Sequence, residues 1–241
     1  MRAIFPPEPE QKLVRDFFGA QKQRFFVEVG AFEPQKHSQS FHLEQAGWTG
    51  ILVEPQPDLA DRLRRERKAR VYEVACSSPD RAGTRMELYI AGGCSSFDRN
   101  LMITGIEAAK VVDVPVQTLD GVLTDACAPQ PIDFLSVDVE GHELEVLSGF
   151  DFARWRPRLI LLEDHVTNLD KHIFLLRHGY ALMRRTGLNG WYVPREDAPA
   201  LGLFGRFQIL RKYYLALPFR KLRDLKRRLR DRIASRKIAG Q

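Results

Sequence analysis

The chain has 241 residues, of which 44% are hydrophobic, so it can form one large domain or two small ones with a packed core, and it is not disordered as a whole. No apolar run reaches the ~18 residues that a membrane span needs, and the opening stretch MRAIFPPEPEQKLV has no apolar region typical of a secretory signal. Three widely spaced cysteines, Cys76, Cys94 and Cys127, fit neither a disulfide framework nor a zinc knuckle. We therefore expect a cytoplasmic protein.

The net charge of +6 is unevenly distributed along the chain. Residues 206–237 contain 13 basic and 2 acidic residues, whereas the rest of the chain contains 24 basic and 29 acidic residues. The mildly acidic body gives no reason to expect a nucleic-acid surface there. We expect one domain over residues 1–205, followed by a basic helical tail over 206–241.

Strand-like apolar runs alternate with amphipathic segments along the body. Ser38 or Ser40 is expected to cap the second helix, and Asp58 the third. The expected strands cover residues 24–30, 49–55, 70–78, 84–90, 132–141, 157–165 and 190–195. The expected helices cover residues 9–20, 38–47, 57–68, 117–126, 142–150 and 171–180. This alternation predicts an α/β fold, in which a mostly parallel sheet is covered by helices on both faces.

Ligands of such sheets bind beyond the carboxyl ends of the strands, so the side chains that follow each strand are the candidate site residues. Four of the five main strands end in acidic groups, and the third ends in Cys76 and two serines. The acidic strand ends are Glu28, Glu54, Asp138 with Glu140, and Glu163 with Asp164 and His165. So many carboxylates at one cleft require a cation, which could be a sulfonium, a metal or protonated His165.

The first of these turns, FFVEVGAFEP, has a single glycine, Gly30, before Glu33 and Pro34. A pyrophosphate needs a glycine-rich turn and free N–H groups, so this turn disfavours a dinucleotide and favours a cationic ligand such as S-adenosylmethionine. Glu54 lies 26 residues after Glu28, where an acid can accept both ribose hydroxyls of an adenosine cofactor. The alternative is that Glu54 is only a solvent-exposed strand end.

The segment DFLSVDVEGHE places Asp138 and Glu140 two residues apart, so that both can face the cleft. One of them could instead cap the following helix. His165 is a candidate general base or, equally, a surface histidine. A divalent metal held by Asp138, Asp164 and His165 is a minor alternative, because their spacing is not diagnostic.

Four segments in this order, over about residues 24–165, resemble the FkbM-type methyltransferases. They are FFVEVGAFEPQKHSQSFHLEQAGWTGILVEPQP, QTLD, IDFLSVDVEGHELEVLSGFDF and RPRLILLE. The resemblance implies the doubly wound, seven-stranded fold of class I S-adenosylmethionine-dependent O-methyltransferases, with a last antiparallel strand in GWYVPR. It implies that the cofactor is contacted by Glu28, Gly30 and Ser38 at the first turn, Glu54 at the ribose, and Ala75 and Cys76 at the adenine. It also implies that Asp138 and Glu140 lie near the transferring methyl group.

We therefore expect O-methyl transfer to a hydroxyl of a sugar, glycan or secondary metabolite, with Asp138, Glu140 or His165 as the base. The segment AGGCSSFDRN, residues 91–100, is the expected substrate loop. The alternatives are an RNA methyltransferase that grips RNA with its basic tail, and a non-catalytic binding protein on the same fold.

The tail itself carries a pattern of its own. Phe219, Leu222, Leu225, Leu229 and Ile233 recur at helical spacing among Lys and Arg. This pattern predicts a basic amphipathic helix that binds an anionic membrane surface, which would place the enzyme peripherally at the inner membrane, or that packs on the body.

Overall fold

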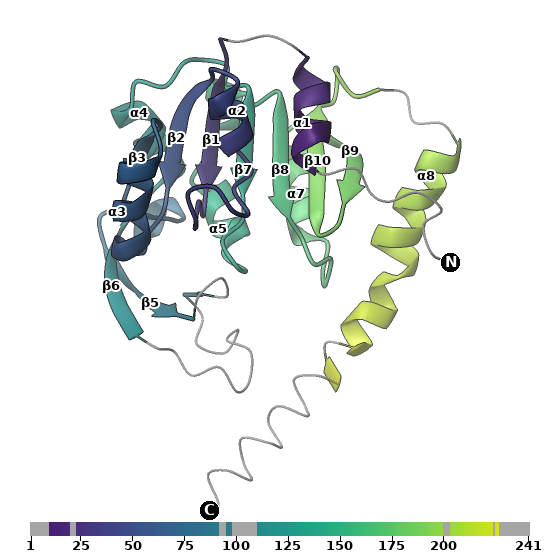
Figure 1. Ribbon diagram of the computed structural model, residues 1–241. Helices are drawn as coiled ribbons and strands as arrows, with labels where there is room; N and C mark the ends of the chain where they lie inside the picture. The colour runs from purple at the N-terminus through teal and green to yellow at the C-terminus, as the bar shows by residue number, and fades with distance from the viewer. Residues whose placement is uncertain are drawn as a thin grey trace, which may run out of the picture.

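A seven-stranded sheet forms the centre of the molecule in the computed structural model, which describes residues 10–19, 23–91, 95–97, 110–199, 203–223 and 225–226 (Figure 1). The strand order is β3-β2-β1-β7-β8-β10-β9. The strands are β1 (Phe25–Val29), β2 (Thr49–Val53), β3 (Arg70–Tyr72), β7 (Phe134–Val137), β8 (Leu159–Glu163), β9 (Tyr180–Thr186) and β10 (Asn189–Pro194). The first five are parallel, and β10 runs antiparallel to both β8 and β9, so the expected antiparallel last strand is confirmed.

Helices cover both faces of this sheet. Successive strand residues point to opposite sides, so the apolar side chains on each face need helices to bury them. Val27 and Val29 belong to the core beneath α4 to α7, whereas Phe26 belongs to the core beneath α1 to α3. The helices are α1 (Glu10–Phe18), α2 (Phe41–Gln45), α3 (Pro57–Glu66), α4 (Leu119–Asp125), α5 (Glu143–Ser148), α6 (Phe152–Trp155), α7 (Asp170–Arg177) and α8 (Leu203–Ile209).

A smaller three-stranded sheet lies beside the carboxyl ends of the main strands (Figure 1). It contains β4 (Ala75–Cys76), β5 (Arg85–Ile90) and β6 (Lys110–Gln117). The single strand predicted over residues 70–78 is therefore wrong in its extent: β3 pairs with β2 in the main sheet, and β4 pairs with β6 in the small one. Strands β6 and β9 and helix α6 were not predicted.

Of the two predicted helix caps, the one at Asp58 is wrong and the one at Ser38 or Ser40 is confirmed in position. The N-cap of α3 is Gln56 with Pro57 at the first position, so Asp58 lies inside the first turn. Ser40 occupies the N-cap position of α2 but makes no side-chain cap bond. Its hydroxyl donates to Glu28, while the hydroxyl of Ser38 accepts from the N–H of Phe41.

The C-terminal segment is helical through α8, the π-helix η2 (Leu210–Leu215), and residues 217–223. The expected domain boundary at residue 205 falls inside α8, and Tyr213 is buried in the core of the body. Of the expected apolar stripe, Leu229 and Ile233 lie outside the described residues. Within the described part of the chain, none of the helices has the length and apolar character to cross a bilayer.

Candidate active site

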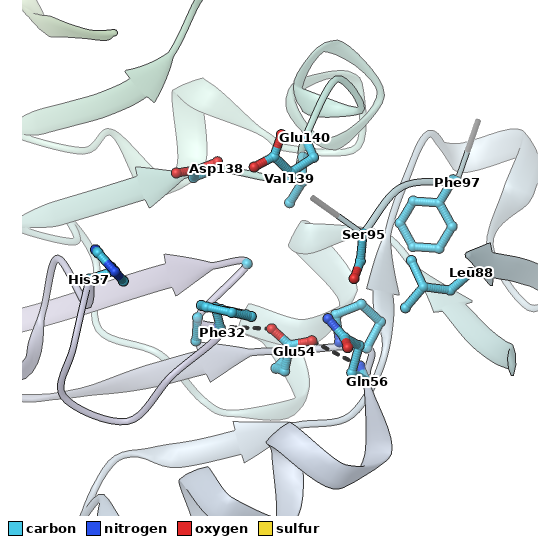
Figure 2. Close-up of a pocket in the computed structure, with 13 residues that line it drawn as sticks. Phe32, His37, Glu54, Gln56, Leu88, Ser95, Phe97, Asp138, Val139 and Glu140 are labelled. Atoms are coloured by element: carbon cyan, nitrogen blue, oxygen red, sulfur yellow. Dashed lines mark hydrogen bonds between the residues drawn. The ribbon is translucent and has the colours of Figure 1, made fainter. Parts of the chain in front are cut away.

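A cavity of about 480 Å³ opens where β1, β2 and β7 end (Figure 2). This is the point at which the strand order reverses, since β1 lies between β2 and β7. The cavity is lined by Gly30, Ala31, Phe32, His37, Glu54, Pro55, Gln56, Leu88, Ser95, Phe97, Asp138, Val139 and Glu140. Three of these described lining residues are carboxylates, and none is a lysine or arginine.

Gly30 allows the ends of β1 and β7 to meet. Its φ is +81°, and a Cβ at this position would lie 1.8 Å from the carbonyl oxygen of Asp138. The N–H groups of Gly30 and Ala31 both donate to the carbonyl of Val53, at 2.9 and 3.1 Å. The single glycine of the turn is therefore required for the backbone contact that shapes the cavity.

Glu54 is fixed at the end of β2 by two backbone donors. Its carboxylate accepts from the N–H of Phe32 and the N–H of Gln56, both at 2.9 Å (Figure 2). The side chain is only 3% exposed, and burial raises its pKa to about 7 against the opposing effect of the two hydrogen bonds. The interpretation of Glu54 as a solvent-exposed strand end is wrong, because the carboxylate is buried and oriented at the cavity wall.

Asp138 and Glu140 lie together on the wall opposite Glu54 (Figure 2). Burial and the neighbouring Glu163 raise the pKa of Asp138 to about 8, and burial and Asp138 raise that of Glu140 to about 7. Glu140 has a φ of +51°, a conformation that side chains other than glycine seldom adopt. The turn thus holds both carboxylates toward one space, as their spacing predicted.

Neither of these two carboxylates caps the next helix. The N-cap of α5 is His142, which makes no side-chain cap bond. The carboxylate that accepts the N–H of Gly141, at 2.9 Å, belongs to Glu143. The side chains of Asp138 and Glu140 therefore do not cap the N-terminus of α5, and the capping interpretation is wrong.

A cluster of acids stands behind the cavity wall. Carboxylate oxygens of Asp138, Glu143 and Glu163 lie within 4.8 Å of one another, close enough to hold a cation. The ammonium of Lys171 already donates to Glu143 at 3.0 Å and to the carbonyl of Glu163 at 2.9 Å. Asp164, one of the predicted metal ligands, is outside this group, and its carboxylate accepts from the N–H of Val166.

Five predicted site residues do not line the cavity: Glu28, Ser38, Ala75, Cys76 and His165. Ala75 and Cys76 are buried, and burial raises the pKa of the Cys76 thiol to about 12. The imidazole of His165 is more than half exposed, with its Nε2 3.6 Å from a carboxylate oxygen of Glu163.

Glu28 and Ser38 instead shape the loop that forms one side of the cavity. The buried carboxylate of Glu28 accepts from the hydroxyl of Ser38 at 2.9 Å, the N–H of Gln39 at 2.6 Å and the hydroxyl of Ser40 at 2.5 Å. Burial raises the pKa of Glu28 despite these donors. Both residues therefore position the first turn rather than face the cavity.

A buried arginine, Arg67, completes this loop. Its guanidinium donates to the carbonyl of Pro34 at 3.0 Å, to the hydroxyls of Ser38 and Ser40 at 3.1 and 2.9 Å, and to Glu44 at 3.3 Å. The carbonyl of Pro34 is therefore held by a buried guanidinium.

Glu33 turns out not to face the cavity. It does not line that space, and its carboxylate lies 4.0 Å from the guanidinium of Arg62. The acidic character of the cavity comes from the strand-end residues Glu54, Asp138 and Glu140.

Several lining residues were not predicted from the sequence. Phe32 and His37 have φ values of 50° and 63°, and no pattern in the sequence signals that conformation for these residue types. Leu88 belongs to β5, which was predicted as an extra strand outside the main series. Its position beside the cavity was not predicted. Ser95 and Phe97 come from the segment predicted to contact the substrate, of which residues 92–94 and 98–100 lie outside the described residues.

Comparisons with known proteins give two similar solved structures and one family match. The chain is similar to the crystal structure of precorrin-6y C5,15-methyltransferase from Geobacter metallireducens GS-15, with a TM-score of 0.40 and 14% identity over 76% of this chain and 85% of that chain. It is also similar to TrmK of M. capricolum in complex with S-adenosylhomocysteine, with a TM-score of 0.42 and 7% identity over 94% of this chain and 98% of that chain. No curated protein sequence matches significantly.

The sequence profile of the methyltransferase FkbM domain matches residues 28–182, from the end of β1 into β9. The match includes Glu54, Asp138 and Glu140, the three carboxylates of the cavity. Because it covers more than half of the 241 residues, the chain belongs to the FkbM methyltransferase family.

Proposed function

We propose that the cavity binds S-adenosylmethionine and that the chain transfers a methyl group to a hydroxyl of a sugar, glycan or secondary metabolite. One observation carries this proposal. Three carboxylates with pKa values raised to about 7 or 8 line one cavity, and no lysine or arginine is among its described lining residues. Such a wall repels phosphates and attracts a cation.

The residues at the cavity fit this cofactor. Glu54 has both oxygens oriented by backbone N–H groups, which leaves further lone pairs for two ribose hydroxyls. Asp138, beside Gly30, is placed to accept from an α-amino group and to stabilise a nearby positive charge. The bound cofactor would supply an electrophilic methyl group on its sulfonium.

Glu140 is the best-placed base for the acceptor hydroxyl. Its carboxylate lines the same cavity, and its pKa of about 7 suits a group that accepts a proton near neutral pH. His165, the other predicted base, does not line the cavity and would act only through Glu163. Phe97, Leu88 and Ser95 form the side of the cavity that would contact the acceptor and exclude water from it.

The test is incubation of the purified chain with S-adenosylmethionine labelled in its methyl group and a panel of sugars, glycans and polyketide alcohols. We expect label in an ether linkage, which mass spectrometry after hydrolysis identifies. Glu140→Gln should retain cofactor binding and lose about 10²–10⁴-fold in turnover. Label on nitrogen or carbon, or in added RNA, would contradict O-methylation, and absence of cofactor binding at millimolar concentration would favour a non-catalytic role.

A further inference from the structure

The outer side of the C-terminal helical segment, residues 203–226, carries a row of exposed apolar side chains, of which Tyr214 also contacts the ring of His172. Twelve large hydrophobic side chains of the described chain are exposed, and eight of them lie on this segment. They recur mostly three or four residues apart: Leu203, Phe207, Leu210, Tyr214, Leu215, Phe219, Leu222 and Leu225. Such a concentration on one helical segment is typical of a docking surface.

The inner side of the same segment is already bound to the body. Ile209, Tyr213 and Leu217, four residues apart, pack against the core that includes β1, β7 and β8. The hydroxyl of Tyr213 accepts from the guanidinium of Arg185 at 3.1 Å, and its ring lies 4.7 Å from that of His172. The body therefore does not cover the exposed row. The alternative that the apolar stripe packs on the body is wrong for its described residues, Phe219, Leu222 and Leu225, which are exposed.

The π-helix η2 determines which side chains of the segment face the body and which face outward. The N–H of Ala216 donates to the carbonyl of Arg211, five residues earlier, at 2.9 Å. One extra residue per turn lets Tyr213 enter the core while Tyr214 and Leu215 both stay outside. In Figure 1 the segment stands at the β9 edge of the sheet, beyond the helices that cover its two faces.

The charge of the segment limits what can cover the apolar row. Its described side chains include seven basic residues and no acidic one: Arg206, Arg211, Lys212, Arg220, Lys221, Arg223 and Lys226. A second copy of the chain would bring the same positive charges together. RNA would satisfy the charge but offers no apolar surface for five leucines. An anionic lipid surface offers both negative headgroups and an acyl boundary.

We propose that the outer side of residues 203–226 docks the protein onto an anionic membrane surface, with the apolar row in the headgroup–acyl boundary and the basic residues among the phosphates. The observation that favours a lipid surface over other anions is the row of leucines between the charges. The inference is independent of the methyl acceptor, because it rests only on this segment and its contacts with the body.

The test uses the full chain, since removing residues beyond 205 would also remove Tyr213 from the core. We expect it to sediment with vesicles of equal parts phosphatidylcholine and phosphatidylglycerol at low salt, and not with pure phosphatidylcholine. The triple variant Lys221→Gln, Arg223→Gln, Lys226→Gln should bind on the order of 100-fold more weakly, about fivefold per charge. The matched control Arg65→Gln, Lys68→Gln, Arg177→Gln removes three exposed charges from the body and should bind like the parent.

A second pair of variants tests the apolar row. Phe219→Ser, Leu222→Ser, Leu225→Ser should lose most vesicle binding, whereas Val111→Ser, Ile173→Ser, Leu188→Ser, at exposed apolar positions on the body, should not. Because all of these side chains are exposed, unfolding temperatures should match the parent's. The proposal is overturned if the parent does not sediment, or if the tail variants bind like their controls. It is equally overturned if the parent binds RNA in preference to vesicles, or if the row instead holds a dimer that the serine variant dissociates.

Discussion

Asp138→Asn should make the protein more stable at alkaline pH while weakening its cofactor site. The pKa of Asp138 is raised from an ordinary 3.8 to about 8 by burial and by Glu163 and Glu143. The folded state therefore holds this proton more tightly than the unfolded state. The resulting stability is fully present below pH ~4 and is lost as the pH rises through about 8. Asparagine never ionises, and its amide can still donate to Glu163, so the variant escapes that loss.

The magnitude follows from the exposure of the group. Each unit of pKa corresponds to about 1.4 kcal/mol. The side chain of Asp138 opens onto the cavity and is not enclosed, so water screens much of the repulsion and about 1–2 kcal/mol of the free energy of unfolding remains. For a chain of this size that gain raises the unfolding temperature by about 3–6 °C.

Calorimetric unfolding at pH 4 and pH 9 measures this effect. The variant should resemble the parent at the lower pH and exceed it at the higher one. Asp197→Asn, at an exposed position, is the matched control and should differ little from the parent at either pH. A gain that is the same at both pH values, or that the control also shows, would refute the idea that the acids of the cavity repel one another.

Two further predictions concern the cofactor. Glu54→Ala should weaken the binding of S-adenosylmethionine by about 1.5–3 kcal/mol, or one to two decades in affinity, because two ribose contacts and the bonds to Phe32 and Gln56 are lost. If calorimetry shows unchanged affinity, Glu54 does not bind the ribose. The parent's affinity for S-adenosylmethionine should rise between pH 6 and pH 9, because Glu54 and Glu140, with pKa values of about 7, and Asp138, with a pKa of about 8, become negatively charged over this range. The affinity for S-adenosylhomocysteine, which lacks the sulfonium charge, should rise less. Parallel pH profiles for the two ligands would mean that the carboxylates do not sense the sulfonium.

The central strands β1, β2, β7 and β8 of the main sheet could be predicted from the sequence because they are short apolar runs that are mostly buried. Strand β9, at the edge of the sheet, could not, because it is only partly buried and contains Arg184 and Arg185. Strand β6 could not, since Lys110, Asp113 and Pro115 interrupt its apolar pattern and it lies in the small sheet, where six of its eight residues stay partly or fully exposed. The split between β3 and β4 was also hidden, because residues 70–78 read as one continuous run. The pairing of Ala75 with Val116 and of Cys76 with Gln117 assigns β4 to the second sheet.

The cavity was only partly predictable for a different reason. Gly30, Glu54, Asp138 and Glu140 follow strands, so the topology alone brings them to one edge. The same reasoning placed Glu28 at the cavity, although its carboxylate turns toward the serines of the next loop. Which way a strand-end side chain turns depends on tertiary partners such as Arg67, and these partners are not apparent from local sequence.

The buried guanidinium of Arg67 has a consequence for how this family can diverge. It lies among two buried acids, Glu28 and Glu44, and the turn at Pro34. Losing the arginine alone would leave two carboxylates without their counter-charge, at a cost of roughly 3–5 kcal/mol, whereas exchanging all three for apolar residues of similar volume need not be destabilising. Positions 28, 44 and 67 should therefore covary among homologues, and a lineage that abandons the arginine should abandon both acids with it.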